Sequence, residues 1–234
     1  MAVLQRLAER IHYLPHEAEV DRPMLVHLQG ERFTLVIDAG YSKNHVECFY
    51  STLQAAQLPL PDFTVLTHWH YDHSFGLSHI HGLGIACAAT NKHLLRAQTA
   101  ALEPDYFLRC KAEDSYFARE YAAQAAPSIV PAAMTFENNL WMELGGLQVH
   151  CQHICSPHSD DCVCIHVPKE RLLFLGDAVC GDYFNAGYMD KQKLASIIDF
   201  IAGIECDTCV LSHEALITKR QLLKELREEL AEEA

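Results

Sequence analysis

The sequence predicts an α+β fold in which two β-sheets pack face to face and helices cover their outer faces. Strand-rich and helical segments follow one another twice along the 234 residues, and this order is typical of such a layered fold. Half of the residues are hydrophobic, so the chain can bury a large core. Neither an internal repeat nor a linker interrupts the sequence. We therefore expect a single domain over residues 1–234.

The first strand-rich part begins with a predicted β-hairpin. Apolar runs at 24–29 and 32–38 flank a turn that contains glycine, as hairpin strands commonly do. Helical spacing follows over 45–57 and is ended by Pro59. The remaining apolar runs of this part predict short buried strands at 63–66 and 84–88.

A long helical segment follows, and we predict it to be an insertion at about 91–126. Alanine, leucine, arginine, glutamate and glutamine dominate it, and Pro104 divides it into two pieces. The second piece carries five aromatic residues, Tyr106, Phe107, Tyr116, Phe117 and Tyr121. Aromatic residues at helical spacing are usually part of a core. The alternative is that this segment forms the roof of a binding site, and the sequence leaves both interpretations open.

The second strand-rich part is expected to contain a meander and a further hairpin. The meander strands are predicted at 135–136, 140–144 and 147–154. The hairpin strands are predicted at 162–167 and 171–175, on either side of a turn that contains proline. The chain then ends in a predicted helix at 191–204, a strand at 208–211 and a helix at 214–232.

Four metal-binding residues directly follow the strand predicted at 63–66, in the pattern His68-x-His70-x-Asp72-His73. Imidazole nitrogens and carboxylate oxygens are good ligands for zinc, iron or manganese. A loop at the end of a strand can turn His68 and His70, which alternate, toward one point. Asp72 and His73 fall on the next turn, where they can reach a second ion.

This pattern resembles the signature of the metallo-β-lactamase fold superfamily, whose fold is an αββα four-layer sandwich of two packed β-sheets. Three later segments match further motifs of that family, each after an apolar strand: Ser156-Pro157-His158-Ser159, Gly176-Asp177 and Ser212-His213. The family usually has a glycine between the proline and the histidine of the first of these motifs, and this chain lacks it. His153 is the competing histidine, but it lies within a predicted strand, so His158 is preferred.

The resemblance implies two divalent metal ions, with zinc first and with iron or manganese also compatible. The first ion would be held by His68, His70 and His158. The second would be held by Asp72, His73 and His213, and Asp177 would bridge the two ions. Asp38, at the end of the strand predicted at 32–38, corresponds to a family aspartate that orients a ligand histidine by a hydrogen bond.

The activity implied by the resemblance is hydrolysis of a small-molecule ester, lactone or thioester by hydroxide bound between two metal ions. Asp72 would orient the nucleophile or transfer a proton. Tyr183 would donate a hydrogen bond to an oxyanion, or would be a packed aromatic residue of its loop. Other members of the superfamily leave a mononuclear iron dioxygenase acting on a persulfide, and a phosphodiesterase, as alternatives. A third alternative is a metal-binding protein without catalysis.

Composition limits the partners and the location. The formal charge is −13, with 31 acidic residues against 18 lysines and arginines, which disfavours nucleic acid as a partner. Neither a secretory signal nor a stretch long enough to cross a membrane is recognisable, so we expect a cytoplasmic protein and disfavour an exported β-lactamase. Its ten cysteines are then expected to be free thiols. The oligomeric state is left open, and a homodimer is one option.

Overall fold

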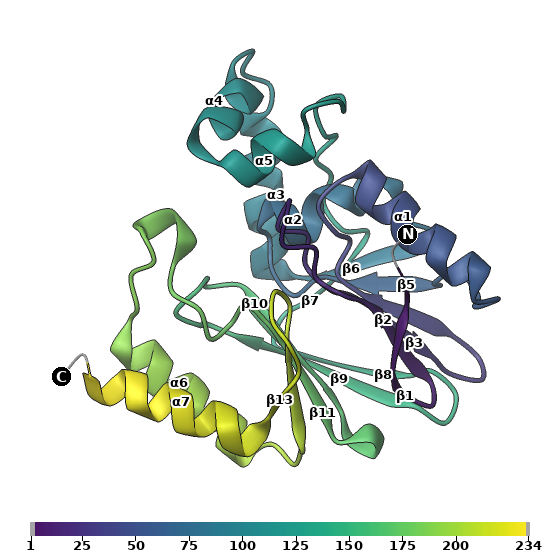
Figure 1. The fold of residues 1–234 in the computed structure, drawn as a ribbon, viewed down its shortest axis with the longest axis vertical. Helices are drawn as coiled ribbons and strands as arrows, with labels where there is room; N and C mark the ends of the chain where they lie inside the picture. Colours follow the sequence, from purple (N-terminus) through teal and green to yellow (C-terminus); the bar gives the residue numbers. More distant parts are fainter. Residues whose placement is uncertain (1–2, 233–234) are drawn as a thin grey trace.

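The computed structural model describes residues 3–232 and confirms the predicted fold class, because two β-sheets pack face to face with helices outside them (Figure 1). The first sheet has, in spatial order, β1 Gln5–Ala8, β2 Ile11–Leu14, β3 Leu25–Gln29, β4 Thr34–Ile37, β5 Phe63–Val65, β6 Leu83–Cys87 and β7 Met134–Phe136. The second has β13 Ile217–Thr218, β12 Thr208–Leu211, β11 Leu172–Gly176, β10 Cys162–Val167, β9 Gln148–Ile154 and β8 Asn139–Glu143.

Helices cover the outer face of each sheet. Those on the side of the first sheet are α1 Lys43–Ala55, α2 Tyr71–Ser74, α3 Ala88–Ala100, α4 Tyr106–Glu113 and α5 Ser115–Glu120, with the 3-10 turn η1 Phe75–His79. Those on the side of the second sheet are α6 Lys191–Gly203 and α7 Lys219–Glu232. The 3-10 turns η2 Pro168–Glu170 and η3 Tyr183–Asn185 lie in the connections before β11 and α6. The four layers of the sandwich can be followed in Figure 1.

The main core lies between the two sheets. Its apolar side chains alternate along the strands, so one face of each sheet is turned inward. Val26, Ile37 and Val65 come from the first sheet, and Ile165 and Phe174 come from the second. All five are almost completely buried, and each such side chain contributes roughly 1.5–3 kcal/mol of burial free energy.

The structure corrects parts of the predicted element list. The segment at 135–136 does not belong to a meander, because β7 joins the first sheet parallel to β6. The final helix begins at Lys219 rather than at 214, since a short strand, β13, precedes it. The strands β1 and β2 were not predicted. The segment after Pro104 is divided once more at Asp114, whose side chain caps the amino terminus of α5.

Several strands run parallel and bring their carboxyl ends together. In the first sheet β4, β5 and β6 are parallel, and in the second sheet β11 and β12 are parallel. Polar side chains that follow such strands meet at one edge of the sandwich. The chain therefore delivers residues that are far apart in sequence to a single place.

Among the described residues no helix is both long and apolar enough to span a lipid bilayer. All ten cysteines are free thiols, as expected.

Candidate metal centre

The structure brings together the seven side chains that the sequence singled out as ligands. They form two groups, each with its nitrogen and oxygen atoms within 4.8 Å of one another. The first group is His68, His70 and His158, and the second is Asp72, His73, Asp177 and His213. Their elements are the loop after β5 with the start of α2, the turn between β9 and β10, and the loops after β11 and β12.

In the first group, imidazole nitrogens face one another across a short distance. His158 Nε2 lies 3.2 Å from His68 Nε2. The His70 ring centroid is 4.5 Å from each of the His68 and His158 centroids. Two nitrogens bound 2.0–2.1 Å from a tetrahedral zinc ion are about 3.3 Å apart. The spacing of this group therefore fits a divalent cation at its centre.

The second group combines two imidazoles with two carboxylates. His213 Nε2 lies 3.3 Å from His73 Nε2, and each of these nitrogens is 3.1 Å from Asp72 Oδ2. Asp177 Oδ2 lies 3.2 Å from His73 Nε2 and 3.4 Å from His213 Nε2. Carboxylate oxygens and imidazole nitrogens are ligands that zinc, iron and manganese share.

Asp177 connects the two groups. The same oxygen that faces His73 and His213 also lies 3.7 Å from His158 Nε2 of the first group. Asp177 reaches this position because the chain before it, at Gly176, passes close to Thr67. Gly176 precedes Asp177 with a φ of +56°, and a Cβ atom there would lie 2.9 Å from the Thr67 side chain.

Hydrogen bonds to the other ring nitrogen orient three of the histidines. His73 Nδ1 donates to Asp38 Oδ2 at 2.8 Å, and His158 Nδ1 donates to the carbonyl oxygen of Gly181 at 2.9 Å. His213 Nδ1 donates to Asp21 Oδ1 at 3.0 Å. With the proton held on Nδ1, each Nε2 presents a lone pair to the centre, as a metal ligand must.

The predicted hydrogen bond that Asp38 accepts from a candidate ligand histidine, His73, is present. Asp38 also accepts hydrogen bonds from the Thr67 backbone N–H at 2.7 Å and from the Thr67 hydroxyl at 2.9 Å, so both of its oxygens are occupied. Asp21 has the same role toward His213 and was missed by the sequence analysis. It lies in an irregular segment before β3, where its φ is +56°.

Histidine pKa values are shifted in opposite directions in the two groups. Burial, followed by neighbouring imidazoles, lowers the pKa of His68 well below its ordinary value and lowers the pKa of His70 to about 3. Burial also acts to lower the pKa of His73 and His213. There the carboxylates of Asp72 and Asp177 outweigh it and raise the pKa of both, that of His213 to about 12. The charges that favour a proton on these imidazoles also favour a divalent cation in its place.

Both groups open into a cavity of about 480 Å³. Its wall includes Tyr41 after β4, Tyr71 of α2, Asp114 before α5 and Tyr183 of η3. The helical segment thus contributes Asp114 to the wall of the cavity, while its Phe117 and Tyr121 are buried in a core cluster. Some residues of this segment therefore belong to the core, and one lines the candidate site, so each of the two interpretations left open by the sequence holds for part of it.

Two further histidines, the competing candidate His153 and its neighbour His150, lie outside these groups. His153 is in β9, and its Nε2 contacts the carbonyl oxygen of Asp160. His150 is on the same strand and stacks against Trp141 with ring centroids 4.2 Å apart. The preference for His158 over His153 agrees with this geometry.

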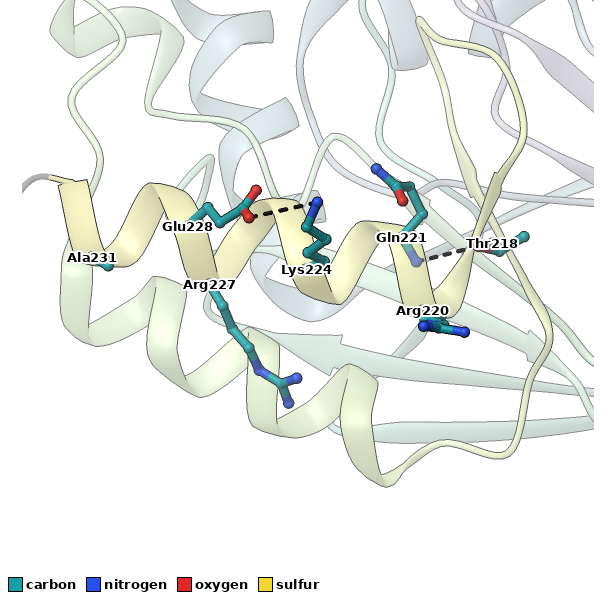
Figure 2. A pocket seen from close by; sticks show the side chains of 7 residues that line it. All are labelled: Thr218, Arg220, Gln221, Lys224, Arg227, Glu228 and Ala231. Carbon is teal, nitrogen blue, oxygen red and sulfur yellow. Dashed lines mark hydrogen bonds and ion pairs between the residues drawn. The ribbon is translucent and has the colours of Figure 1, made fainter.

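A larger hollow lies along α7 and carries no comparable chemistry (Figure 2). Its volume is about 900 Å³, and its lining residues come from one exposed face of α7 and from β13: Thr218, Arg220, Gln221, Lys224, Arg227, Glu228 and Ala231. Lys224 and Glu228 form an ion pair there at 3.7 Å. This surface is the solvated face of an amphipathic helix whose other face packs on the second sheet.

Comparison with known proteins agrees with this geometry. Residues 24–213 match the family model described as the metallo-beta-lactamase superfamily. The chain belongs to the metallo-β-lactamase superfamily. Within it, the chain is 25% identical over 189 residues to an acyl-coenzyme A thioesterase, MBLAC2, from Gallus gallus. That match covers 76% of this chain but 64% of the length of the relative.

Solved structures of other proteins share the fold. A metallo-beta-lactamase from Pontibacter korlensis superposes with a TM-score of 0.67 at 16% identity, and the match covers 99% of each chain. A double mutant of the sec-alkyl sulfatase PisA1 superposes with a TM-score of 0.74 at 14% identity, covering 98% of this chain and 42% of the other. At such identities the likeness concerns the fold alone.

Proposed function

We propose that this member of the metallo-β-lactamase superfamily is a metal-dependent hydrolase of small-molecule acyl esters, lactones or thioesters, with acyl thioesters as the leading substrate class. The observation that carries the proposal is the position of Asp177 Oδ2 between two groups of ligand atoms at the floor of a cavity. The similarity to an acyl-coenzyme A thioesterase supports the choice of thioesters.

We propose zinc for both ligand groups, and iron or manganese fit the same donors. When bound, two such cations polarise a carbonyl oxygen and lower the pKa of a water molecule. The residues of the chain supply the rest. Asp72 lines the cavity, where its carboxylate can accept a proton from the attacking water. Asp38 and Asp21 hold His73 and His213 in their orientation.

The lining of the cavity supports an uncharged electrophile. The lining contains four carboxylates, Asp21, Asp72, Asp114 and Asp177, and no lysine or arginine among the residues that the structure describes. With Asp72 and Asp177 offset by the cations that they would hold, Asp21 and Asp114 remain as acidic neighbours, and a phosphodiester would find no basic side chain of the lining to receive its charge. Esters, lactones and thioesters carry no such charge at the reacting carbon.

Metal analysis and a substrate screen test the proposal. Protein purified without chelator should contain two metal ions per chain and should hydrolyse an acyl thioester, a lactone or an ester. One iron per chain together with oxygen uptake on a persulfide would instead identify a dioxygenase, and turnover of phosphodiesters alone would identify a phosphodiesterase. Either of these results would overturn the proposal.

Variants of the ligand groups provide the second test. Asp177→Ala and His158→Ala should each lose metal and abolish hydrolysis, because each removes a donor that the centre requires. His150→Ala is the matched control, since His150 is a histidine of β9 that lies outside both groups. It should retain metal and activity. Full turnover by Asp177→Ala at unchanged metal content would contradict the proposed mechanism.

A further inference from the structure

Asp114 is the one carboxylate of the cavity that lies outside both ligand groups and the histidine contacts around them. It is buried and precedes α5. Its Oδ1 accepts hydrogen bonds from the backbone N–H of Tyr116 at 2.6 Å and of Phe117 at 3.0 Å. These two bonds cap the helix and fix the orientation of the carboxylate.

The second oxygen of Asp114 receives two phenol hydroxyls. Tyr71 and Tyr183 both donate to Asp114 Oδ2, the latter at 2.7 Å. A phenol has a single proton, and that of Tyr183 is directed at the carboxylate, while the Tyr71 hydroxyl lies within hydrogen-bonding reach of both Asp114 and Tyr183. What the Tyr183 hydroxyl can offer to the cavity is therefore a lone pair, which accepts a hydrogen bond. Burial, with the neighbouring Asp114 charge, raises the pKa of Tyr183 to about 12, so its hydroxyl stays protonated at neutral pH.

The two phenols differ in their surroundings. The Tyr71 ring is stacked on Tyr41 with centroids 5.4 Å apart, and its edge meets Phe117 at 5.2 Å. Tyr183 is half exposed, and its ring centroid lies 6.5 Å from that of His70, a member of the first ligand group. Tyr183 is thus the phenol that a molecule bound at the metal centre can reach.

We propose that Asp114 is a positioning residue that makes the Tyr183 hydroxyl a hydrogen-bond acceptor for an N–H group of the substrate close to the scissile bond. This inference rests on the proposed function. It assigns to the site a preference for thioesters whose thiol part carries an amide N–H a few bonds from the sulfur, as coenzyme A does. It also makes the Tyr183 hydroxyl a hydrogen-bond acceptor, whereas the sequence suggested a donor to an oxyanion.

Two synthetic thioesters isolate this hydrogen bond. S-Butanoyl-N-acetylcysteamine carries the amide N–H, and its N-methyl analogue lacks it while keeping the acyl group and the thioester. A neutral hydrogen bond of this kind changes affinity by about tenfold. The metal-loaded protein should therefore show a KM about tenfold lower for the N–H compound at a similar kcat.

Asp114→Asn is the decisive variant. The asparagine oxygen can still cap α5, but its NH2 group now faces the two phenols and must donate to them. The Tyr183 hydroxyl is then free to donate into the cavity. The preference for the N–H compound should disappear through a higher KM for that compound. Tyr183→Phe should also remove the preference, and the double variant should show no greater loss than Tyr183→Phe alone.

Asp190→Asn is the matched control. Asp190 caps α6 through the backbone N–H of Gln192 and Lys193, as Asp114 caps α5, but it does not line the cavity. It should keep the preference. If Asp114→Asn does not fold, Tyr183→Phe carries the same test, because it removes a single hydroxyl from a half-exposed ring.

The outcomes separate this inference from the proposed function. Hydrolysis of both thioesters with equal KM by the unmodified protein would overturn the inference and leave the proposed function standing. Equal losses on both compounds in Asp114→Asn, with the preference retained, would show that Asp114 only caps a helix. Hydrolysis of neither thioester, with turnover of another class, would overturn the thioester assignment and the inference with it.

Discussion

Asp38 offers the sharpest single test of how the second ligand group is held. Its carboxylate is buried, and its two oxygens serve three donors: the Thr67 backbone N–H, the Thr67 hydroxyl and His73 Nδ1. Asp38→Asn keeps the size of the side chain. Asparagine also tolerates the left-handed backbone that the φ of +66° at this position requires. The substitution therefore changes the hydrogen bonds and little else.

The magnitude follows from the loss of one acceptor. An amide has a single oxygen, so either the Thr67 N–H or His73 Nδ1 faces an NH2 group. If His73 turns to its other tautomer to accept from that group, its Nε2 carries the proton and cannot bind a cation. An unpaired buried donor costs about 1–3 kcal/mol. We therefore expect binding of the second metal ion to weaken 10- to 100-fold, the range found when such supporting partners are removed.

Competition with a chromogenic chelator measures this effect. Metal-depleted protein and its Asp38→Asn variant should be titrated with zinc, with two affinities fitted for each. In the variant, one of the two zinc affinities should fall, and we assign that ion to the second group. The affinity for the other ion, at His68, His70 and His158, should change little. Asp62→Asn is the control, since Asp62 accepts a hydrogen bond from the Thr34 backbone N–H but lies outside both groups.

Unchanged zinc affinities in a folded Asp38→Asn variant would refute this reasoning, because the tautomer of His73 would then not depend on Asp38. Circular dichroism and thermal melting of the metal-depleted proteins establish that the variant is folded. An equal loss at both ligand groups would also count against it, since only His73 of the second group contacts Asp38.

Three further predictions concern stability. Burial lowers the pKa of His27 from 6.5 to about 4, so as the pH falls the unfolded chain binds a proton at this residue before the folded chain does. The free energy of unfolding of the metal-depleted protein should therefore fall by about 3 kcal/mol from pH 6.5 to pH 4. Urea titrations should show a smaller decrease in His27→Gln. Gly30→Ala should prevent folding, because the new Cβ would lie 2.0 Å from the carbonyl oxygen of Leu144 in the turn between β8 and β9; a cooperative native-like melt would disprove this. Glu120→Ala should cost about 3 kcal/mol by leaving Arg22 without its buried partner, and a thermal melt unchanged from that of the unmodified protein would count against it.

Local sequence was sufficient for the elements that carry strong patterns. The hairpin of β3 and β4, the helices α1 and α6, and the hairpin of β10 and β11 were all predicted close to their observed positions. The periodicity of the sequence did not predict which strands pair when the partners are far apart along the chain. The strand β7 follows the helical segment in sequence but pairs with β6, because a three-residue strand has no pattern that distinguishes one sheet from the other.

The ligand set shows the same division. Order and spacing in the chain, together with the family motifs, predicted seven candidate metal ligands that the structure brings together, because strand ends in this fold lead to one edge. Asp21 and Asp114 were not identified, because neither belongs to a motif. Asp21 contacts His213, which is 192 positions away, and Asp114 contacts Tyr183, which is 69 positions away.

The sequence by itself determined the family, the layered fold and which side chains can serve as metal ligands, since those properties depend on residue types and on their order along the chain. Only the tertiary structure decided which atoms face one another, which ring nitrogen of His73, His158 and His213 faces a hydrogen-bond acceptor, and which tyrosine hydroxyl is committed to a carboxylate. Those properties depend on contacts across long stretches of chain, and such contacts exist only after the two sheets have packed.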